Sequence, residues 1–457
     1  MFGHTFIKVD TATIPYAINY SALVRDDIGP FEYAYDGNFG KFQSHYKMLT
    51  FNLKDSEYRD DEFRDLINIE LDFNEDEVQN LILHMYEIKD TDENYFFMTR
   101  NCSSEILKLL DMAKYDSNFS DELETVTLPI DIVYILKNNS LTKDTTKTLS
   151  KLKLFNLHVE QLTQDERVVL QKILEQKITI SDFAKLQTLS DKSKSLIISS
   201  AIAYIEMKLV QQKLHRKYTS SLLHLIELQR EYEDLSKEEV VELEDFPVSN
   251  KYNRVSIGSR SVEDQKTEIN LGYRLWYRDR FDLVDDEVKN GSVELLDFSL
   301  KFVDDDVSLN HLTFINLESM PISNEYFSEH TTKLKVAMER LFYDEDLYTF
   351  AKYGRGYRYR IDKNFTYNFA LSGGVYYHDE DVYAISPDIS LEYNLANSFV
   401  SVLKYEYAKY SNSIDVNNIY LDNYYKVNDY STMKVEFSYK DDVKSYSEMR
   451  LSYSIHF

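Results

Sequence analysis

Cysteine, proline, glycine and tryptophan are all scarce in this sequence. Its 457 residues include 1 Cys, 6 Pro, 11 Gly and 1 Trp. The single cysteine, Cys102, excludes an internal disulfide framework and any metal site built from several cysteines. A lone cysteine is either a small buried hydrophobe or a reactive thiol, so it is the first residue whose chemistry needs explaining.

Basic residues and long apolar runs are also lacking. Lys and Arg total 52 against 78 Asp and Glu, which gives a formal net charge of −26 and argues against nucleic acid as a partner. The longest apolar helical stretch, Leu196–Met207, is too short to span a membrane as a helix. No secretion signal is visible after Met1. With 43% hydrophobic residues the chain has enough apolar content to bury a core, so a wholly disordered chain is excluded.

The first part of the chain, residues 1–117, has a mixed α and β pattern. Residues 2–9 and 16–23 are strand-like, and glycines and a proline in residues 29–40 indicate a loop. A helix is predicted to follow Asn74, and Tyr95–Met98 is predicted to be a short buried strand. Asn101 has the character of an N-cap for a helix from Cys102 to Lys114.

The second part, residues 118–248, is predicted to be helical because apolar residues recur every three or four positions. The long segment Leu196–Tyr232 fits one or two helices, and the acidic run Glu238–Asp245 is typical of a solvated linker. We find no chemical signal in this part, so we expect its apolar stripes to serve packing.

The third part, residues 249–457, alternates apolar and polar residues almost throughout and holds about two thirds of the 37 tyrosines. We predict an antiparallel β-barrel of roughly 12 strands, because membrane strands need ~9–11 residues with one lipid-facing side. Tyrosine suits the interfacial girdles of such a barrel. The opposite faces carry charges that would line a lumen, namely Lys333, Lys335, Glu339, Lys404 and Glu406. A soluble β-sandwich or barrel with one buried face is the alternative.

Two residues of the first part suggest thiol chemistry. Cys102 opens a predicted helix, where the helix dipole favours a thiolate and backbone N–H groups are available to hold an oxyanion. His4, next to Gly3 on a predicted strand, is the strongest candidate for the base that a cysteine nucleophile needs. A packed structural cysteine and an ordinary strand histidine are the alternatives. The other histidines show no helical metal-ligand spacing, so neither a metal site nor a cofactor is expected.

Several spaced motifs of residues 1–115 resemble one known family. They are Met1–Val9 (MFGHTFIKV), Ala17–Ala22 (AINYSA), Gly37–Gly40 (GNFG), Tyr46–Met48, Arg64–Leu66, Tyr95–Phe97 and Asn101–Ser104 (NCSS). In this order they are similar to the Lnb-type N-terminal periplasmic domain, a family that includes lipoprotein N-acyltransferases. Asp36–Phe39 departs from the Gly-Leu-rich text that members often carry there, which affects the substrate-groove loop.

The resemblance implies a circularly permuted NlpC-type or papain-like fold, so the predicted fold class is multidomain: this α+β domain, a helical middle segment and the barrel. It carries over His4 and Cys102 as the catalytic pair. A third polar group would orient the histidine. A hairpin of 2–9 and 15–23 would place residues near 19 and 20 opposite His4, and of these two we favour Asn19 over Tyr20. In the family the MFGH text follows a secretion signal, so we expect an upstream segment and export. The implied location is the outer membrane, with a periplasmic N-terminal domain.

Two hypotheses of function follow. The first is a cysteine-dependent acyltransferase or hydrolase that acts at the outer membrane through an acyl-enzyme on Cys102. Its expected partners are outer-membrane lipid and a lipoprotein or peptidoglycan substrate, and the sequence does not separate transferase from hydrolase. The second is a non-catalytic outer-membrane channel or anchor with a periplasmic binding module.

Overall fold

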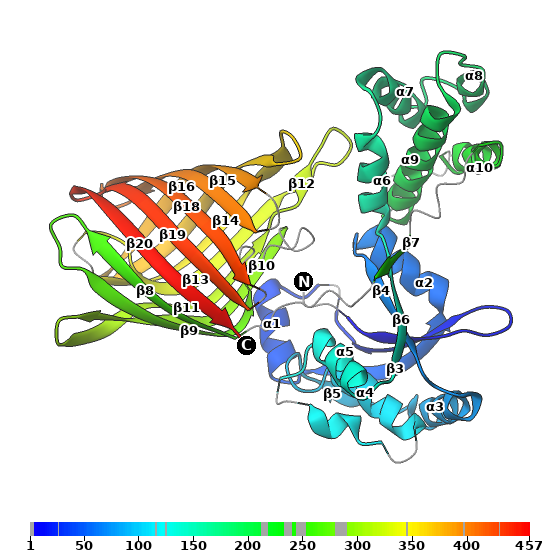
Figure 1. Cartoon of the computed structure of the whole chain (residues 1–457), viewed down its shortest axis with the longest axis horizontal. Coiled ribbons are helices and arrows are strands. Elements are labelled where there is room, and N and C mark those ends of the chain that lie inside the picture. Colours follow the sequence, from blue (N-terminus) through cyan, green and yellow to red (C-terminus); the bar gives the residue numbers. More distant parts are fainter. Residues whose placement is uncertain are drawn as a thin grey trace. The chain divides into compact units, whose positions relative to one another are not determined.

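The computed structural model describes residues 4–25, 27–114, 117–123, 126–211, 218–232, 240–243, 253–278, 290–343, 346–395, 398–428 and 430–457. The chain forms two compact units, Phe2–Pro247 and Val248–Phe457. Figure 1 shows the helices and a small sheet in the first unit and the long strands in the second.

An antiparallel sheet is the base of the first unit. Within the described residues it has four strands in the order β1-β2-β3-β5: β1 (Phe6–Val9), β2 (Tyr16–Ala22), β3 (Phe42–Thr50) and β5 (Glu93–Tyr95). The β1–β2 hairpin that the sequence predicts is present, with Phe6 opposite Asn19. Ala17, Ile18, Asn19 and Tyr20 are all buried, so β2 is covered on both faces.

Helices pack against this sheet and build the core of the unit. They are α1 (Pro30–Asn38), α2 (Phe51–Ser56) with a π-turn at Glu57–Asp61, α3 (Glu75–Ile88), α4 (Cys102–Ala113), a 3₁₀ turn at Phe119–Glu122 and α5 (Pro129–Asn138). The core joins strand side chains such as Ile18 and Tyr20 to the apolar face of α4, which includes Ile106, Leu109 and Leu110. Helix α3 begins as predicted, with a capping box between Asn74 and Glu77.

Two local predictions for this unit are wrong. The segment 29–40, predicted to be a loop, contains α1, because a proline at the first helical position already has helical φ and needs no hydrogen bond there. Gly37 lies inside α1, where a Cβ would be 2.3 Å from the Phe97 ring. The strand predicted at Tyr95–Met98 instead lies at Glu93–Tyr95 and shares only Tyr95 with the prediction, because Phe96 pairs with Arg100 in a tight turn that leads to Asn101.

The segment 118–248 contains strands as well as helices. β6 (Thr142–Thr148) pairs with β4 (Leu66–Leu71) on one side and with β7 (Val240–Leu243) on the other. β7 is the described part of the acidic run predicted to be a linker; the rest of that run lies outside the described residues. Between β6 and β7 are α6 (Lys151–Glu160), α7 (Gln164–Leu174), α8 (Ile180–Ala184), α9 (Asp191–Val210) and α10 (Tyr218–Gln229). α9 packs against α6, α7 and α10, and no described helix is long and apolar enough to cross a membrane.

The second unit is a closed antiparallel barrel. Its twelve long strands, counted over the described residues, are β8 (Arg254–Val262), β9 (Glu268–Arg278), β10 (Gly291–Val303), β11 (Asp306–Ser319), β13 (Thr331–Arg340), β14 (Leu347–Arg360), β15 (Phe365–His378), β16 (Glu380–Leu395), β17 (Phe399–Tyr410), β18 (Asp415–Asn428), β19 (Ser431–Asp441) and β20 (Ser445–His456). A short strand, β12 (Ile322–Ser323), runs parallel to β14. The barrel closes where β20 pairs with β8, drawn red beside green in Figure 1.

The alternation of side chains sorts apolar from polar surfaces. Apolar residues such as Ile257, Leu271 and Leu451 are exposed on the outside, as a lipid-facing band requires. The charged residues predicted to line a lumen do line the interior cavity; they are Lys333, Lys335, Glu339, Lys404 and Glu406. The predicted fold class, an α/β region, helices and a barrel of about 12 strands, is therefore confirmed.

Candidate active site

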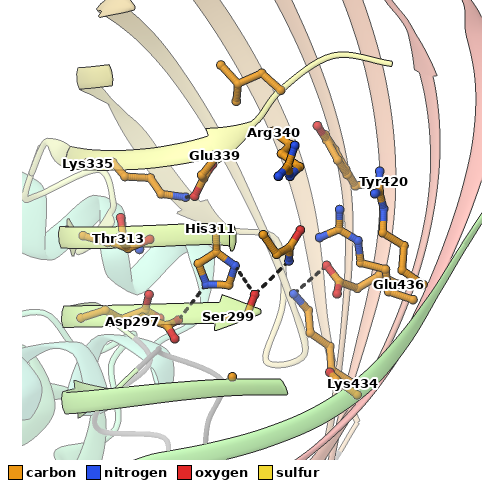
Figure 2. A pocket seen from close by; sticks show the side chains of 18 of the residues that line it. Asp297, Ser299, His311, Thr313, Lys335, Glu339, Arg340, Tyr420, Lys434 and Glu436 are labelled. Carbon is orange, nitrogen blue, oxygen red and sulfur yellow. Dashed lines mark hydrogen bonds and ion pairs between the residues drawn. The ribbon is translucent and has the colours of Figure 1, made fainter. Parts of the chain in front are cut away.

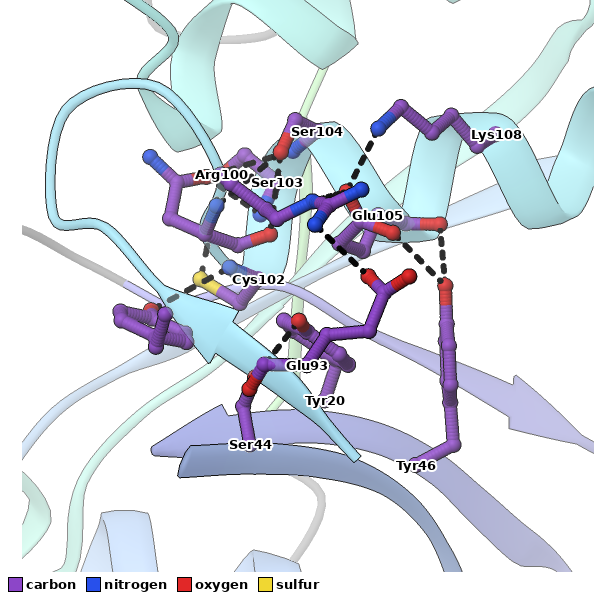
Figure 3. Close-up of polar contacts among 12 residues, drawn as sticks. Tyr20, Ser44, Tyr46, Glu93, Arg100, Cys102, Ser103, Ser104, Glu105 and Lys108 are labelled. Atoms are coloured by element: carbon purple, nitrogen blue, oxygen red, sulfur yellow. Dashed lines mark hydrogen bonds and ion pairs between the residues drawn. The ribbon is translucent and has the colours of Figure 1, made fainter. Parts of the chain in front are cut away.

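Cys102 is the first residue of α4, as the sequence predicts. Asn101 caps the helix: its side-chain oxygen accepts hydrogen bonds from the backbone N–H groups of Ser103 (2.9 Å) and Ser104 (3.2 Å). The same amide donates to the carbonyl oxygens of Phe97 and Thr127, which fixes the turn before the helix. Figure 3 shows Cys102 at this helix start, followed by Ser103, Ser104 and Glu105. The thiol is buried, with the residue 5% exposed.

The structure brings the three candidate residues together. His4 Nε2 lies 2.5 Å from Asn19 Oδ1, and the His4 side chain is hydrogen-bonded to Cys102. Because an amide oxygen only accepts hydrogen bonds, Nε2 carries a proton and Nδ1 is left to face the thiol. Asn19 is buried on β2, whereas the neighbouring Tyr20 points into the core and bonds to Ser44. Gly3 lies outside the described residues.

The surroundings of Cys102 favour its thiolate. Burial alone raises the pKa of the thiol, but the hydrogen bond and the charge of His4 lower it. The backbone N–H of Thr5 and the hydroxyl of Tyr95 also donate to the sulfur and lower the pKa further, to about 7. At neutral pH a substantial fraction of Cys102 is therefore ionised.

The pKa of His4 moves in the opposite direction. Burial lowers it, but the hydrogen bond and charge of Cys102 and the hydrogen bond to Asn19 together raise it above the ordinary value. The opposite shifts of the two groups are those of a thiolate–imidazolium pair, in which each charge stabilises the other. The His4 ring also stacks on Tyr58, at 5.8 Å between ring centroids.

Tyr95 belongs to the site, although the sequence analysis named it only as part of a strand and a motif. Its hydroxyl oxygen accepts a hydrogen bond from the backbone N–H of Cys102 at 3.2 Å, so its proton is directed to the thiol of the same residue. The spacing of residues along the sequence does not predict this contact, because the contact depends on the turn between β5 and α4. Tyr58, which stacks on His4, was missed for the same reason.

The helix start does not hold an unoccupied set of oxyanion donors, contrary to expectation. The backbone N–H of Cys102 is bonded to Tyr95, and those of Ser103 and Ser104 are bonded to Asn101. An oxyanion at this point would have to displace the tyrosine hydroxyl as the acceptor or receive a hydrogen bond from it.

A polar network holds α4 against the sheet, as Figure 3 shows. The Tyr46 hydroxyl donates to the carbonyl oxygen of Glu105 at 3.0 Å. The buried Glu105 carboxylate lies 2.7 Å from the amine of Lys108 and 3.5 Å from the guanidinium of Arg100, which also pairs with Glu93. These bonds fix the helix start, and therefore the sulfur, relative to β3 and β5 of the sheet that also contains Asn19.

The barrel contains the other candidate site, a polar cavity of about 620 Å³. Figure 2 shows part of its wall, where Lys335 pairs with Glu339 and Lys434 with Glu436.

The cavity wall also holds a hydrogen-bonded histidine and ion pairs that cross the barrel. Ser299 bonds to His311 Nδ1 at 2.8 Å, and Asp297 lies 3.8 Å from the other ring nitrogen. Pairs such as Lys333–Asp388 and Lys352–Glu406 join strands that are not neighbours. Among the described residues no cluster of three or more His, Cys, Asp or Glu is suited to a metal ion.

In comparisons with known proteins, a different family model matches residues in each of the two units. Residues 1–139 match the family described as Lnb N-terminal periplasmic domain, and residues 248–456 match a domain of unknown function (DUF7840). No curated protein matches the chain.

Several solved structures are similar to part of the chain. One is an outer membrane channel from Pseudomonas putida F1, with 9% identity and a TM-score of 0.31 over 48% of this chain and 100% of that one. Another is the KdgM porin in complex with disordered oligogalacturonate, with 12% identity and a TM-score of 0.29 over 45% and 99%. A third is an anion-selective porin from Comamonas acidovorans, with 7% identity and a TM-score of 0.26 over 45% and 98%.

The location of the protein follows from both units. The barrel has an apolar exterior and a charged interior, which is the arrangement of a membrane-spanning barrel. The protein therefore combines a region similar to the Lnb N-terminal periplasmic domain with an outer-membrane β-barrel, and it is located at the outer membrane with its N-terminal unit in the periplasm.

Proposed function

We propose that the protein is a cysteine-dependent acyl-transfer enzyme that its barrel holds at the outer membrane. The observation that carries the proposal is the Cys102–His4–Asn19 arrangement: a buried thiol with a lowered pKa, a histidine bonded to it, and an amide that orients the histidine. A helix that begins at the cysteine packs on the sheet that carries Asn19, and His4 lies just before the first strand of that sheet. This arrangement supports a papain-like type of site.

The chemistry assigns a role to each group. His4 takes the thiol proton, and the Cys102 thiolate attacks a carbonyl carbon of an ester or amide. The C–S bond forms, the bond to the leaving group breaks, and the protonated His4 gives its proton to that leaving group. An amine or water then attacks the thioester, the C–S bond breaks, and His4 accepts the proton of the attacking group. Asn19 keeps the imidazole oriented throughout.

For the substrate we infer a lipid ester as acyl donor and the α-amine of a lipoprotein as acceptor. The support is the resemblance of residues 1–115 to the family and the covalent link to a membrane barrel, which raises the effective concentration of lipid near the site. Hydrolysis of an amide in peptidoglycan is the related reaction with the same first step.

The test is to trap the acyl-enzyme. Full-length protein in phospholipid vesicles is incubated with a fluorescent diacyl phospholipid and a diacylated lipopeptide. We expect a hydroxylamine-sensitive fluorescent adduct on the protein and N-acylated lipopeptide. Cys102→Ser should abolish both, whereas His84→Gln, which alters a histidine on α3, should leave both unchanged. Failure of wild-type protein to form the adduct with lipid, peptidoglycan or peptide substrates would contradict the proposal.

The second candidate is a non-catalytic channel or anchor with a periplasmic binding module. The closed barrel with its polar cavity favours this candidate, because both are features of the structure itself, whereas catalysis is a proposal. Under this alternative, Cys102→Ser would change neither lipid chemistry nor the transport of solutes.

A further inference from the structure

The chain that follows β13 turns into the barrel. Phe342 is only 4% exposed and belongs to an apolar cluster within the barrel. Its ring contacts Tyr348 of β14 and Tyr410 of β17, with centroids 5.1 and 5.3 Å apart. Leu341 packs against the same cluster. An apolar group of this size inside a barrel of otherwise charged interior needs an explanation.

Tyr343 continues to the opposite wall. Its ring lies 5.0 Å from that of Tyr446 on β20, and its hydroxyl accepts a hydrogen bond from Lys444 at 3.3 Å. The side chain of Gln265, in the β8–β9 turn, donates to its carbonyl oxygen at 3.5 Å. Around the wall, β13 and β20 are separated by β11, β10, β9 and β8 in one direction and by the remaining strands in the other. The segment Leu341–Tyr343, here named the mouth strap, therefore crosses the opening.

The cavity ends at the mouth strap. Its lining begins with Arg254, Thr432 and Ser454, at the end of the barrel where β8 starts and β20 finishes. It extends along the barrel to Tyr410 and Val416 at the other end, where Leu341 and Phe342 also line it. The polar cavity therefore runs along the barrel and is blocked at one end by apolar side chains of the mouth strap.

We propose that the mouth strap seals the barrel at the end away from Phe457, so that the resting protein does not conduct and the cavity opens only when the strap leaves. The inference concerns the barrel and does not rest on the thiol chemistry. For the channel alternative, it means that solutes pass only when the mouth strap has moved out of the barrel.

Conductance of full-length protein in planar lipid bilayers tests the seal. The variant is Phe342→Gly combined with Tyr343→Gly, which removes both the apolar cluster contact and the far-wall contacts. If the strap is open in about 1% of wild-type molecules, its loss raises the mean conductance by roughly 100-fold. The matched control is Asn412→Gly in the β17–β18 turn, whose side chain bonds only within its own turn. Cys102→Ser should conduct as little as wild type, which separates this test from that of the enzyme.

Each result is decisive once heat-modifiable migration on SDS gels shows a folded barrel. If the double variant does not fold, Tyr343→Ala replaces it, because this variant keeps Phe342 in its cluster. Silent wild type with a conducting strap variant supports the seal. Steady conductance of wild type, strap variants as silent as wild type, or equal opening by Asn412→Gly would each overturn it.

Discussion

At the residue scale, the state of Cys102 depends on opposing effects of similar size. Burial disfavours the thiolate, while His4, Tyr95 and the N–H of Thr5 favour it, and the pKa of about 7 is the result. Removing one of these donors should therefore have a large effect, because burial remains and is no longer offset.

His4→Gln should raise the pKa of Cys102 from about 7 to its ordinary value of 9.0 or above. The thiolate fraction at pH 6 then falls roughly 100-fold, since each pKa unit is a factor of ten in ionisation. The measurement is the rate of iodoacetamide alkylation of full-length protein between pH 5 and 10. His84→Gln is the control and should keep the wild-type midpoint. An unchanged midpoint in His4→Gln would show that the pair is not coupled.

Tyr95→Phe should also raise the thiol pKa, but by less than His4→Gln, because it removes one neutral donor and leaves the histidine in place. The same alkylation profile measures it. Tyr20→Phe is a matched control, since Tyr20 is another buried tyrosine of this core and bonds to Ser44 instead of the thiol. A Tyr95→Phe profile that overlays wild type would mean that the hydroxyl serves packing alone.

The sequence predicted the positions of these residues unevenly. Cys102 and Asn101 are adjacent and act within one helix start, so a local pattern was enough. His4 and Asn19 required a hairpin, which the strand pattern predicted. The predicted register, with residues 19 and 20 opposite His4, was wrong, because Asn19 pairs with Phe6. Tyr95 and Tyr58 reach the site through the three-dimensional path of the turn and the π-turn, and no spacing along the chain encodes that. The catalytic roles themselves stay a prediction.

At the element scale, the start of α4 determines where the sulfur lies. Asn101 both caps the helix and bonds to Phe97 and Thr127, so it ties the helix to two separate segments. A cap of this kind contributes more than a solvent-exposed one, because its loss leaves buried backbone groups without partners.

Asn101→Ala should destabilise the first unit by about 2–4 kcal/mol, a cap loss of ~1 plus the cost of unpaired buried carbonyls. Asn74→Ala removes an exposed cap of α3 and should cost only about 1 kcal/mol. The measurement is the urea concentration at which Cys102 of full-length protein becomes fully reactive to a thiol reagent. Equal midpoints for the two variants would contradict the tying role of Asn101.

Predictions of helices and strands failed where a residue type is compatible with more than one structure, or where a strand depends on a distant partner. Proline and glycine in residues 29–40 indicated a loop, yet Pro30 starts α1 and Gly37 makes room for Phe97. Strands β6 and β7 lie in a segment of helical pattern because β6 pairs with β4, which is distant in the sequence, and β7 pairs with β6. The barrel strands were predictable, because strict alternation over many residues reports a two-sided environment directly.

At the scale of the whole molecule, the barrel interior depends on balanced charges. Glu448 accepts hydrogen bonds from Arg260 at 3.0 Å and from Lys440 at 3.2 Å, and it also pairs with Arg450. Arg260 also pairs with Glu268 at 3.1 Å. Because the charged groups of Arg260, Lys440 and Glu448 are buried, losing one of them costs more stability than losing a member of an exposed pair.

Glu448→Gln should destabilise the barrel by about 3 kcal/mol, because it removes the carboxylate that pairs with buried Lys440 and one of the two that pair with Arg260. Glu380→Gln, at an exposed position by the β15–β16 turn, should have an effect near zero. The measurement is the temperature at which the folded band is lost on SDS gels. Equal temperatures for the two variants would mean that water or other acids compensate inside the barrel.

The pairing of Thr148 with Val240 has a consequence for the helices between them. Because β6 and β7 are neighbours in one sheet, the polypeptide leaves for α6 and returns after α10 at nearly the same place. We therefore expect a short linker from β6 to β7 to preserve the pairing of these two strands, while the deletion also removes the packing of α6 and α9 on the π-turn Glu57–Asp61. Such a deletion would reveal whether the five helices serve recognition of another molecule or only shield the sheet edge.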